Sequence, residues 1–464
     1  MKIAQNISIY ILVAFLLLQG YSCLNKNHLP DKHTALPDTL KVGTLYSPTS
    51  LFIFRGDTMG YEYERISNFA KDKNIKVKFV IAKNMESMIA MLDSGKIDVI
   101  AYEIPITAEY KDLVLNCGTE NITHQVLVQP KSDSLITDVT QLIGKDVWVE
   151  KNSKYESRLR NLDNEIGGGI EIHTISEDSL ITEDLIDLVS DGKITYTIVD
   201  SDIAKLNSTY YDNIDISMSV SFPQRSSWAV RLNDKWLADS INEWSRLAKS
   251  KDEYKNVLKR YFELSKRSLD DSASEYFLPK DSKHHNNGIS PFDHIFKEYA
   301  ATIDWDWKLL ASQAWIESRF DTTVVSWAGA KGLMQIMPGT ARAYGLRYNE
   351  ASNAAKNVRA AVACISDLNA YFAKRIPHKK ERLKFIIAAY NSGLGHIVDA
   401  MALAKKYGKN PNIWYGNVEE AILWKSNPDF YNDEVCKYGY FRGRQTVAYV
   451  KKVLHQYELF KKTY

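Results

Sequence analysis

The chain has 464 residues and lacks the features of several common protein classes. It contains only 4 cysteines and 10 histidines, and none of them has the spacing of a metal site. The formal net charge of +2 is too small to indicate a nucleic-acid-binding protein. The apolar run near the start, Ile7 to Leu18, is shorter than the roughly 20 residues that a membrane-spanning helix needs. We therefore expect no metal, no cofactor and no nucleic-acid partner.

The N-terminal segment has the pattern of an export signal. Lys2 precedes the apolar run, and the residues Gln-Gly-Tyr-Ser then lead to Cys23. This pattern predicts a lipoprotein-type signal peptide over 1–22, lipidation of Cys23 and a tether over 23–37. A plain cleaved signal remains the alternative, because Gly20 stands where leucine is commonest. We expect an exported protein that is lipid-anchored at the membrane facing the periplasm, with the outer membrane as the preferred location.

Three cysteines remain in the mature chain, namely Cys117, Cys364 and Cys436. An exported compartment permits disulfides, and an odd number leaves at least one thiol free or paired elsewhere. Only Cys364 and Cys436 fall within one predicted domain, so they are the one pair we expect could form inside it.

The first half alternates predicted strands and helices. From Asp38 onward the pattern gives the order βαβαβ, at 40–45, 61–73, 77–82, 85–92 and 98–102. That order predicts an open sheet with helices on both faces. A similar run from 146 to 200 predicts a second lobe, and 228–231 is expected to cross back to the first. The expected domain covers 38–262 and has a cleft between its two lobes.

A polar segment follows this half. Residues 263–290 are rich in Ser, Asp, Lys, His and Asn and can bury little apolar surface. We interpret them as a linker that leads to a second domain over 291–464.

The second domain carries one acid in an unusual place. A helix over 306–320 would put Leu310, Ala314 and Glu317 on one apolar stripe. Burial there favours the protonated form of a carboxyl group, which could then donate its proton. The alternative is that Glu317 lies at the edge of the stripe and pairs with Arg319 or a lysine.

Two further strings could supply neighbours for this acid. Gly329 and Gly332 permit a tight turn that can bring Met334 and Gln335 against a substrate. Tyr390 and Asn391 stand near the end of a predicted buried helix. Each string alone is typical of an ordinary loop or helix end.

In order, these strings match motifs of the soluble lytic transglycosylase domain, a mostly helical relative of goose-type lysozyme. The matching residues are Glu317-Ser318, Gly332-Leu333-Met334-Gln335, Ala389-Tyr390-Asn391 and Tyr449-Val450. The resemblance covers 291–464 and implies a peptidoglycan-cleaving domain. It implies that Ser318, Met334, Gln335 and Asn391 contact the substrate, and that Tyr390 and Tyr449 position Glu317 or the developing charge. Gln445 departs from the glutamate that is usual in the family.

The chemistry must work with a single acid. Most glycosidases use two carboxyl groups, and the nearest second one, Asp321, would face Glu317 only if the helix continued past Phe320. One group would then act twice. The resemblance implies that Glu317 protonates the bond between N-acetylmuramic acid and N-acetylglucosamine and then deprotonates the muramoyl 6-hydroxyl, which gives a 1,6-anhydro end. The alternatives are a lysozyme-like hydrolase and a catalytically silent, wall-binding or sensing lipoprotein.

The first half resembles the family 3 solute-binding proteins, which close two lobes around amino acids. The similarity is carried by Gly60-Tyr61-Glu62, Ser94 to Val99 and Val199-Asp200. The family's carboxylate-clamping arginine is replaced here by Tyr110 and Lys111, and a lysine cannot form the same bidentate fork. Asp200 matches the family's acid for the ligand ammonium group, with capping of the next helix as its alternative role.

Both halves together resemble the family of membrane-bound lytic murein transglycosylases F. This resemblance implies that the partners are peptidoglycan glycan strands, the membrane through a lipid anchor, and a wall-derived muropeptide or amino acid that the first domain senses. Regulation of the second domain would require either the linker or a direct interface between the domains.

Overall fold

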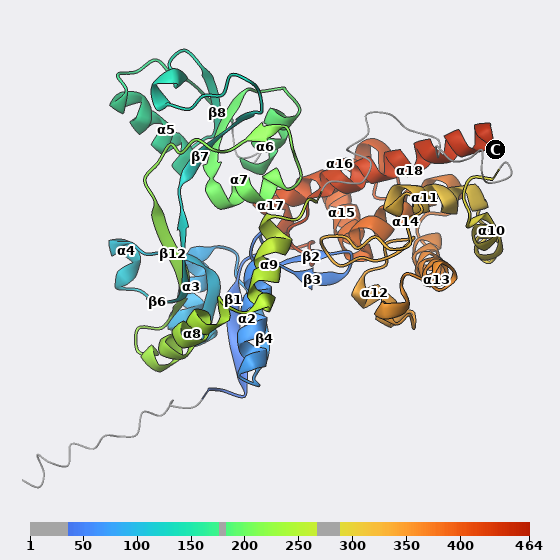
Figure 1. Ribbon diagram of the computed structural model, residues 1–464, viewed down its shortest axis with the longest axis horizontal. Helices are drawn as coiled ribbons and strands as arrows, with labels where there is room; N and C mark the ends of the chain where they lie inside the picture. Colours follow the sequence, from blue (N-terminus) through green and yellow to red (C-terminus); the bar gives the residue numbers. More distant parts are fainter. Residues whose placement is uncertain (1–35, 176–181, 267–287) are drawn as a thin grey trace, which may run out of the picture.

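Figure 1 shows the computed structural model, which describes residues 36–175, 182–266 and 288–464. The predicted export signal, Cys23 and most of the predicted linker lie outside these residues. Two α/β lobes stand on one side of the molecule, and a helical domain stands on the other. The expected fold class, a two-lobed α/β domain followed by a mostly helical one, is confirmed.

The first lobe is built on a five-stranded sheet in the order β4-β1-β5-β12-β6. β1 is parallel to β4 and β5, whereas β12 is antiparallel to β5 and β6. Its core is formed by alternate residues such as Val42 and Val99, together with Trp228. The elements are β1 (Thr39–Thr44), α2 (Tyr61–Asp72), β4 (Lys76–Ile81), α3 (Met85–Asp93), β5 (Val99–Pro105), α4 (Ala108–Lys111), β6 (Leu115–Thr123), β12 (Gln224–Val230), α8 (Lys235–Ala248) and α9 (Asp252–Phe262).

The second lobe has its own five-stranded sheet, in the order β11-β7-β10-β8-β9. The chain enters it after β6 and returns to the first sheet through β12, as the sequence predicted for 228–231. Its elements are β7 (Gln125–Pro130), η1 (Val139–Leu142), β8 (Asp146–Glu150), α5 (Lys154–Glu165), β9 (Glu171–Ile175), α6 (Thr182–Ser190), β10 (Tyr196–Asp200), α7 (Ser201–Ser208) and β11 (Ile214–Asp215).

A short hairpin leaves the first lobe and reaches the helical domain (Figure 1). It consists of β2 (Phe52–Phe54) and β3 (Asp57–Met59), joined by a two-residue turn. Both turn residues have left-handed backbone angles, with φ of 50° at Arg55 and 87° at Gly56. Such turns match the twist of the strands, but a residue with a side chain pays about 1–2 kcal/mol for this conformation. An arginine at the tip therefore indicates a role for its side chain.

The helical domain is organised around α11 (Trp307–Ser318). Every residue from Leu309 to Ser318 is buried, so this is a core helix and not the one-sided amphipathic helix that the sequence predicted. It packs mainly against α10 (Asp293–Ala301) and α18 (Gly443–Thr463). The domain also contains α12 (Pro338–Ala343), η3 (Tyr348–Glu350), α13 (Ala354–Ala373), α14 (Lys379–Ser392), α15 (Leu394–Lys406), η4 (Trp414–Val418), α16 (Glu419–Leu423), η5 (Trp424–Ser426) and α17 (Pro428–Tyr431).

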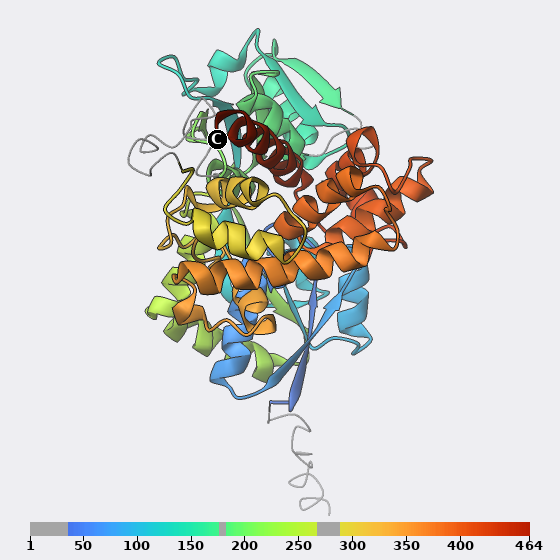
Figure 2. The ribbon, with the colours of Figure 1, turned by 90° about the vertical axis from the view of Figure 1, so that its right-hand side faces the viewer.

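The helical domain contacts both lobes directly (Figure 2). In the second lobe, Glu183 accepts a hydrogen bond of 2.6 Å from the Tyr440 hydroxyl, and Asp187 forms an ion pair with Arg442. With the first lobe, the hairpin provides one contact, and the Tyr431 hydroxyl donates to the Tyr46 carbonyl at 3.3 Å. Of the two couplings considered from the sequence, a direct interface is therefore present.

The one pair that was possible within this domain, Cys364 with Cys436, is not formed, and both thiols are free. Cys364 lies beside Tyr344, whereas Cys436 lies beside Lys425 and Asp399 in another part of the domain. Across the described ranges, no helix combines the length and the apolar character needed to cross a membrane, and no three potential ligands cluster around a metal position.

Candidate active site

Glu317 lies in the last turn of α11, at the wall of a cavity of about 490 Å³. Its side chain is 4% exposed, which confirms the expected burial. Of the described residues that line the cavity, Glu317 is the only one with a carboxylate. Asp321 is exposed and binds the backbone N–H and hydroxyl of Thr323, so it is not a second acid here.

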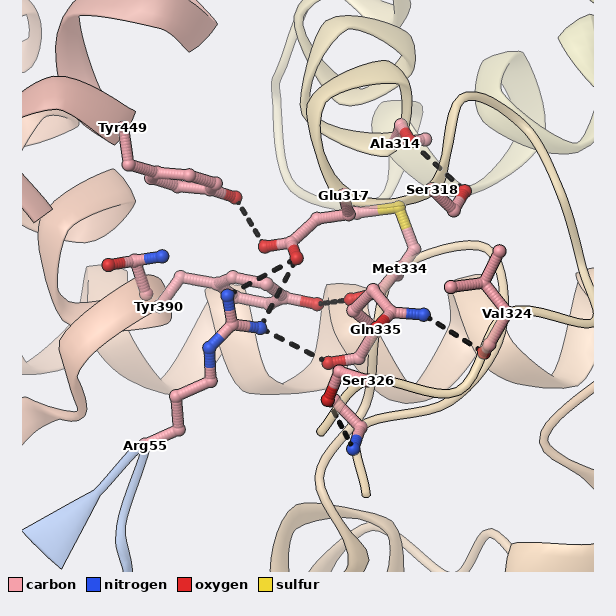
Figure 3. Close-up of polar contacts among 12 residues, drawn as sticks. Arg55, Ala314, Glu317, Ser318, Val324, Ser326, Met334, Gln335, Tyr390 and Tyr449 are labelled. Atoms are coloured by element: carbon pink, nitrogen blue, oxygen red, sulfur yellow. Dashed lines mark hydrogen bonds and ion pairs between the residues drawn. The ribbon is translucent and has the colours of Figure 1, made fainter. Parts of the chain in front are cut away.

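One oxygen of Glu317 is held by α18 (Figure 3). The Tyr449 hydroxyl donates a hydrogen bond of 2.6 Å to Glu317 Oε1. Burial and the neighbouring carboxylate raise the pKa of Tyr449 well above its ordinary value, so this hydroxyl keeps its proton. Glu317 Oε2 remains for other partners.

Two buried hydroxyl groups hold the turn between α11 and α12 by hydrogen bonds to its backbone. The Ser318 hydroxyl donates to the Leu333 carbonyl at 2.8 Å, and the Tyr390 hydroxyl donates to the Met334 carbonyl at 2.7 Å. Ser318 and Met334 are buried and do not line the cavity. In this arrangement they shape the turn, which differs from the substrate contact that the resemblance implied for them.

Gln335 and Asn391 do line the cavity, as expected. Gln335 has a left-handed φ of 47°, and its amide nitrogen donates to the carbonyls of Val324 and Gly332. Asn391 accepts a hydrogen bond of 2.7 Å from the Thr446 hydroxyl. Gln445, the departure from the family pattern, is also part of the lining.

The ion-pair partner of Glu317 comes from the other domain. Arg55, at the hairpin tip, donates to Glu317 Oε2 from both terminal nitrogens, at 3.2 and 3.3 Å (Figure 3). It also donates to the Gln335 carbonyl at 3.4 Å. The Arg55 side chain is 13% exposed, so this ion pair is largely shielded from water. Arg55 and Gln335 also line a second cavity of about 530 Å³, which places the hairpin tip between two hollows.

The β2–β3 hairpin fits closely against the helical domain. Asp57 accepts a hydrogen bond of 3.1 Å from the Gly339 backbone N–H, and a Cβ at Gly339 would lie only 1.9 Å from Asp57. The Ile53 carbonyl accepts a bond of 2.8 Å from Nε2 of the buried His396. Phe54 packs against Trp327 with ring centroids 5.2 Å apart. The hairpin is therefore docked by its backbone, its charges and an aromatic contact.

No pattern in the sequence pointed to a role for Arg55. Its turn is recognisable, but nothing in the sequence relates it to an acid 262 residues later. The same holds for Asp57 and Gly339.

The expected effector residues divide into two groups. Asp200 lines a cavity between the two lobes, where it pairs with Lys154 and accepts a hydrogen bond of 3.3 Å from Tyr155. Its side chain does not cap α7, so the alternative role is not observed. The prediction is wrong for Tyr110 and Lys111, because α4 lies outside this cavity; Tyr110 packs on the core of the first lobe and Lys111 is exposed.

Family models match both domains. Residues 40–264 match the bacterial extracellular solute-binding proteins, family 3, and residues 294–413 match the transglycosylase SLT domain. Tyr449 lies beyond the second match.

Curated relatives extend the similarity to nearly the whole chain. A membrane-bound lytic murein transglycosylase F of Desulfosudis oleivorans is 29% identical and aligns over 89% of this chain and 87% of its own. A protein of the same name from Pseudomonas fluorescens is 27% identical, over 96% and 88%. Among solved structures, a mutant arginine-binding protein of T. maritima is 24% identical over 48% of this chain and 95% of its own, with a TM-score of 0.38.

Proposed function

We propose that the protein is a peptidoglycan lytic transglycosylase. It joins a family 3 solute-binding domain to a transglycosylase SLT domain, and it is similar to membrane-bound lytic murein transglycosylases F over nearly its whole length. It cleaves the β-1,4 bond between N-acetylmuramic acid and N-acetylglucosamine without water. The observation that carries this proposal is the cavity in which Glu317 is the single carboxylate among the described lining residues.

One carboxyl group can complete this reaction alone. Glu317 donates a proton to the glycosidic oxygen as the bond to the muramoyl C1 breaks. The muramoyl 6-hydroxyl then attacks C1, and the Glu317 carboxylate takes the hydroxyl proton. The acid is regenerated, and the product carries a 1,6-anhydro ring. Tyr449 holds Oε1 throughout, so Oε2 transfers the proton in both steps.

Digestion of purified peptidoglycan, followed by mass spectrometry of the ends, tests the activity. We expect 1,6-anhydro ends from the wild-type protein and more of them from an Arg55→Ala variant. Reducing ends would instead identify a hydrolase. Release of nothing by either protein would identify a silent wall-binding lipoprotein.

Tyr449→Phe is expected to lower kcat about 10- to 100-fold with little change in KM, because a hydrogen bond to a charged group contributes about 1.5–3 kcal/mol. The loss acts on the orientation of Glu317 and not on substrate binding, so the effect should appear in kcat. Tyr457→Phe is the matched control, since this tyrosine lies on the same helix and donates to the exposed Asp306. Equal effects of the two variants would contradict a specific role for Tyr449.

We propose further that the first domain regulates the second through the β2–β3 hairpin. Arg55 occupies Oε2, the oxygen that Tyr449 does not hold, and the hairpin tip lies between two hollows that a glycan strand could otherwise occupy together. In this position the guanidinium group blocks the oxygen that would otherwise face the glycosidic bond. Binding of a wall-derived effector between the lobes would favour an arrangement in which the hairpin is withdrawn.

The membrane association of the relatives supports an anchored location. We propose that the protein is exported and that acylated Cys23 tethers it to the outer membrane. A tethered enzyme remains next to an insoluble substrate.

A further inference from the structure

The two lobes enclose a cavity of about 220 Å³ that is rich in carboxylates. Drug-sized ligands occupy pockets of about 300 Å³ or more, so this volume favours a small ligand. Both lobes contribute charge: Glu62 and Glu103 come from the first, and Glu183, Asp200 and Asp202 from the second. The cationic side chains of the lining are Lys154 and Arg225.

Both of these cations already have acidic partners. Lys154 pairs with Asp200, and Arg225 donates to Glu120 at 2.9 Å, outside the lining. Glu62 is compensated by Arg65 at 3.2 Å. The carboxylates still to be accounted for are Glu103, Asp202 and Glu183.

Glu103 and Asp202 belong to different lobes and make no ion pair with any residue in the described ranges. Glu103 accepts hydrogen bonds only from the neutral groups of Asn121, at 2.6 Å, and Ser226, at 3.0 Å. Burial, and then repulsion from Glu62, raises the pKa of Glu103 to about 7. Burial, and then repulsion from Glu103, raises the pKa of Asp202 to about 7. The two lobes thus repel each other across the cavity when both acids are ionised.

Among the described residues of the lining, both cations are already paired with acids, so neither is free to hold a ligand carboxylate. The expected positions, Tyr110 and Lys111, lie outside it. We infer that this cavity binds a small ligand carrying an ammonium or other cationic group, which sits between Glu103 and Asp202 and joins the lobes. The inference deepens the proposed regulation and rests on the role of the first domain as an effector-binding module.

Glu183 connects this cavity to the helical domain. It lines the cavity and accepts the hydrogen bond from Tyr440, and Asp187 on the same helix pairs with Arg442. A cation that changes the spacing of the lobes would therefore shift the element to which the helical domain is attached. Such a contact is the kind of two-state element that allosteric coupling requires.

Calorimetric titration of the purified full-length protein tests the inference. The probes are cadaverine, L-lysine, L-glutamine and L-glutamate. We expect saturable binding of cadaverine or lysine and none of glutamate. Glu103→Gln and Asp202→Asn should each weaken that binding about tenfold or more, which corresponds to about 1.4 kcal/mol. Glu109→Gln, an exposed acid on α4 outside the cavity, should leave it unchanged.

The affinity for the cation should also fall as the pH is lowered from about 8 to about 6, because Glu103 and Asp202 gain protons in this range while an alkyl ammonium group stays charged. The groups that face these two acids are Glu62, Arg65, Asn121, Ser226, Asp200 and Lys154. Neither Asp200 nor Lys154 relieves the charge on the other lobe.

Three results would overturn the inference: glutamine or glutamate binding as tightly as lysine, unchanged affinity in both amide variants, or no binding of any probe. Thermal melting identifies a misfolded variant, since removal of a buried repulsion should keep or raise the Tm. Glycan cleavage by Arg55→Ala is measured in parallel. Cation binding without any cleavage would refute the proposed activity alone, whereas cleavage without cation binding would refute this inference alone.

Discussion

Replacement of Glu317 by glutamine is expected to reduce glycan cleavage by at least the 10²–10⁴-fold that a general acid or base contributes. The same carboxyl group supplies both proton transfers, and within the described ranges no other carboxylate lines the cavity. Glutamine has nearly the same shape and can still accept the Tyr449 hydrogen bond, so the fold should be retained. Initial rates of release from purified peptidoglycan, measured in an Arg55→Ala background, give the size of the loss.

The control for this variant is Glu298→Gln, an exposed glutamate on α10 of the same domain. Its rate should equal that of the parent. Retention of a tenth of the parent rate by Glu317→Gln would refute the assignment of the acid. Binding of glycan to the inactive variant, measured by co-sedimentation, should persist because the residues that line the cavity are otherwise intact.

Local sequence patterns predicted the elements better than the direction in which the side chains point. The alternation of strands and helices correctly predicted both lobes and the return of 228–231 to the first sheet, because each signal lies within a few residues. The burial of Glu317 was predicted correctly, but from an apolar stripe, whereas α11 is buried on all sides. Ser318, one residue later, is rotated by about 100° and points at the Leu333 carbonyl, which only the packed turn reveals.

The residues whose positions the sequence did not predict correctly share a physical cause. Tyr110 and Lys111 lie on a four-residue helix beyond the end of β5, and its direction depends on packing that motif spacing does not encode. Arg55 is the extreme case, since its role exists only after two domains have docked. A costly φ at a turn arginine is the only local trace of that role.

Replacement of Arg55 by alanine is expected to raise basal cleavage about tenfold or more. Its two hydrogen bonds to a buried carboxylate contribute about 1.5–3 kcal/mol to docking of the hairpin, and their loss frees Glu317 Oε2 at the same time. Asp57→Ala should act in the same direction, because it removes the contact with the Gly339 N–H without touching the acid. Cleavage rates on purified peptidoglycan, measured without effector, test both variants.

A fall in the cleavage rate of the hairpin variants would indicate a different role for Arg55. If Arg55 were instead part of the catalytic machinery, for example by stabilising charge during bond cleavage, Arg55→Ala would lower the rate, and Asp57→Ala would lower it through displacement of the same side chain. Arg160→Ala, which removes a surface arginine of the second lobe paired with Glu156, should change neither. A buried ion pair that merely stabilised the fold would change the Tm and not the rate per folded molecule. A rise in the cleavage rate of both hairpin variants would therefore show that the hairpin blocks the active site and is more than a structural contact.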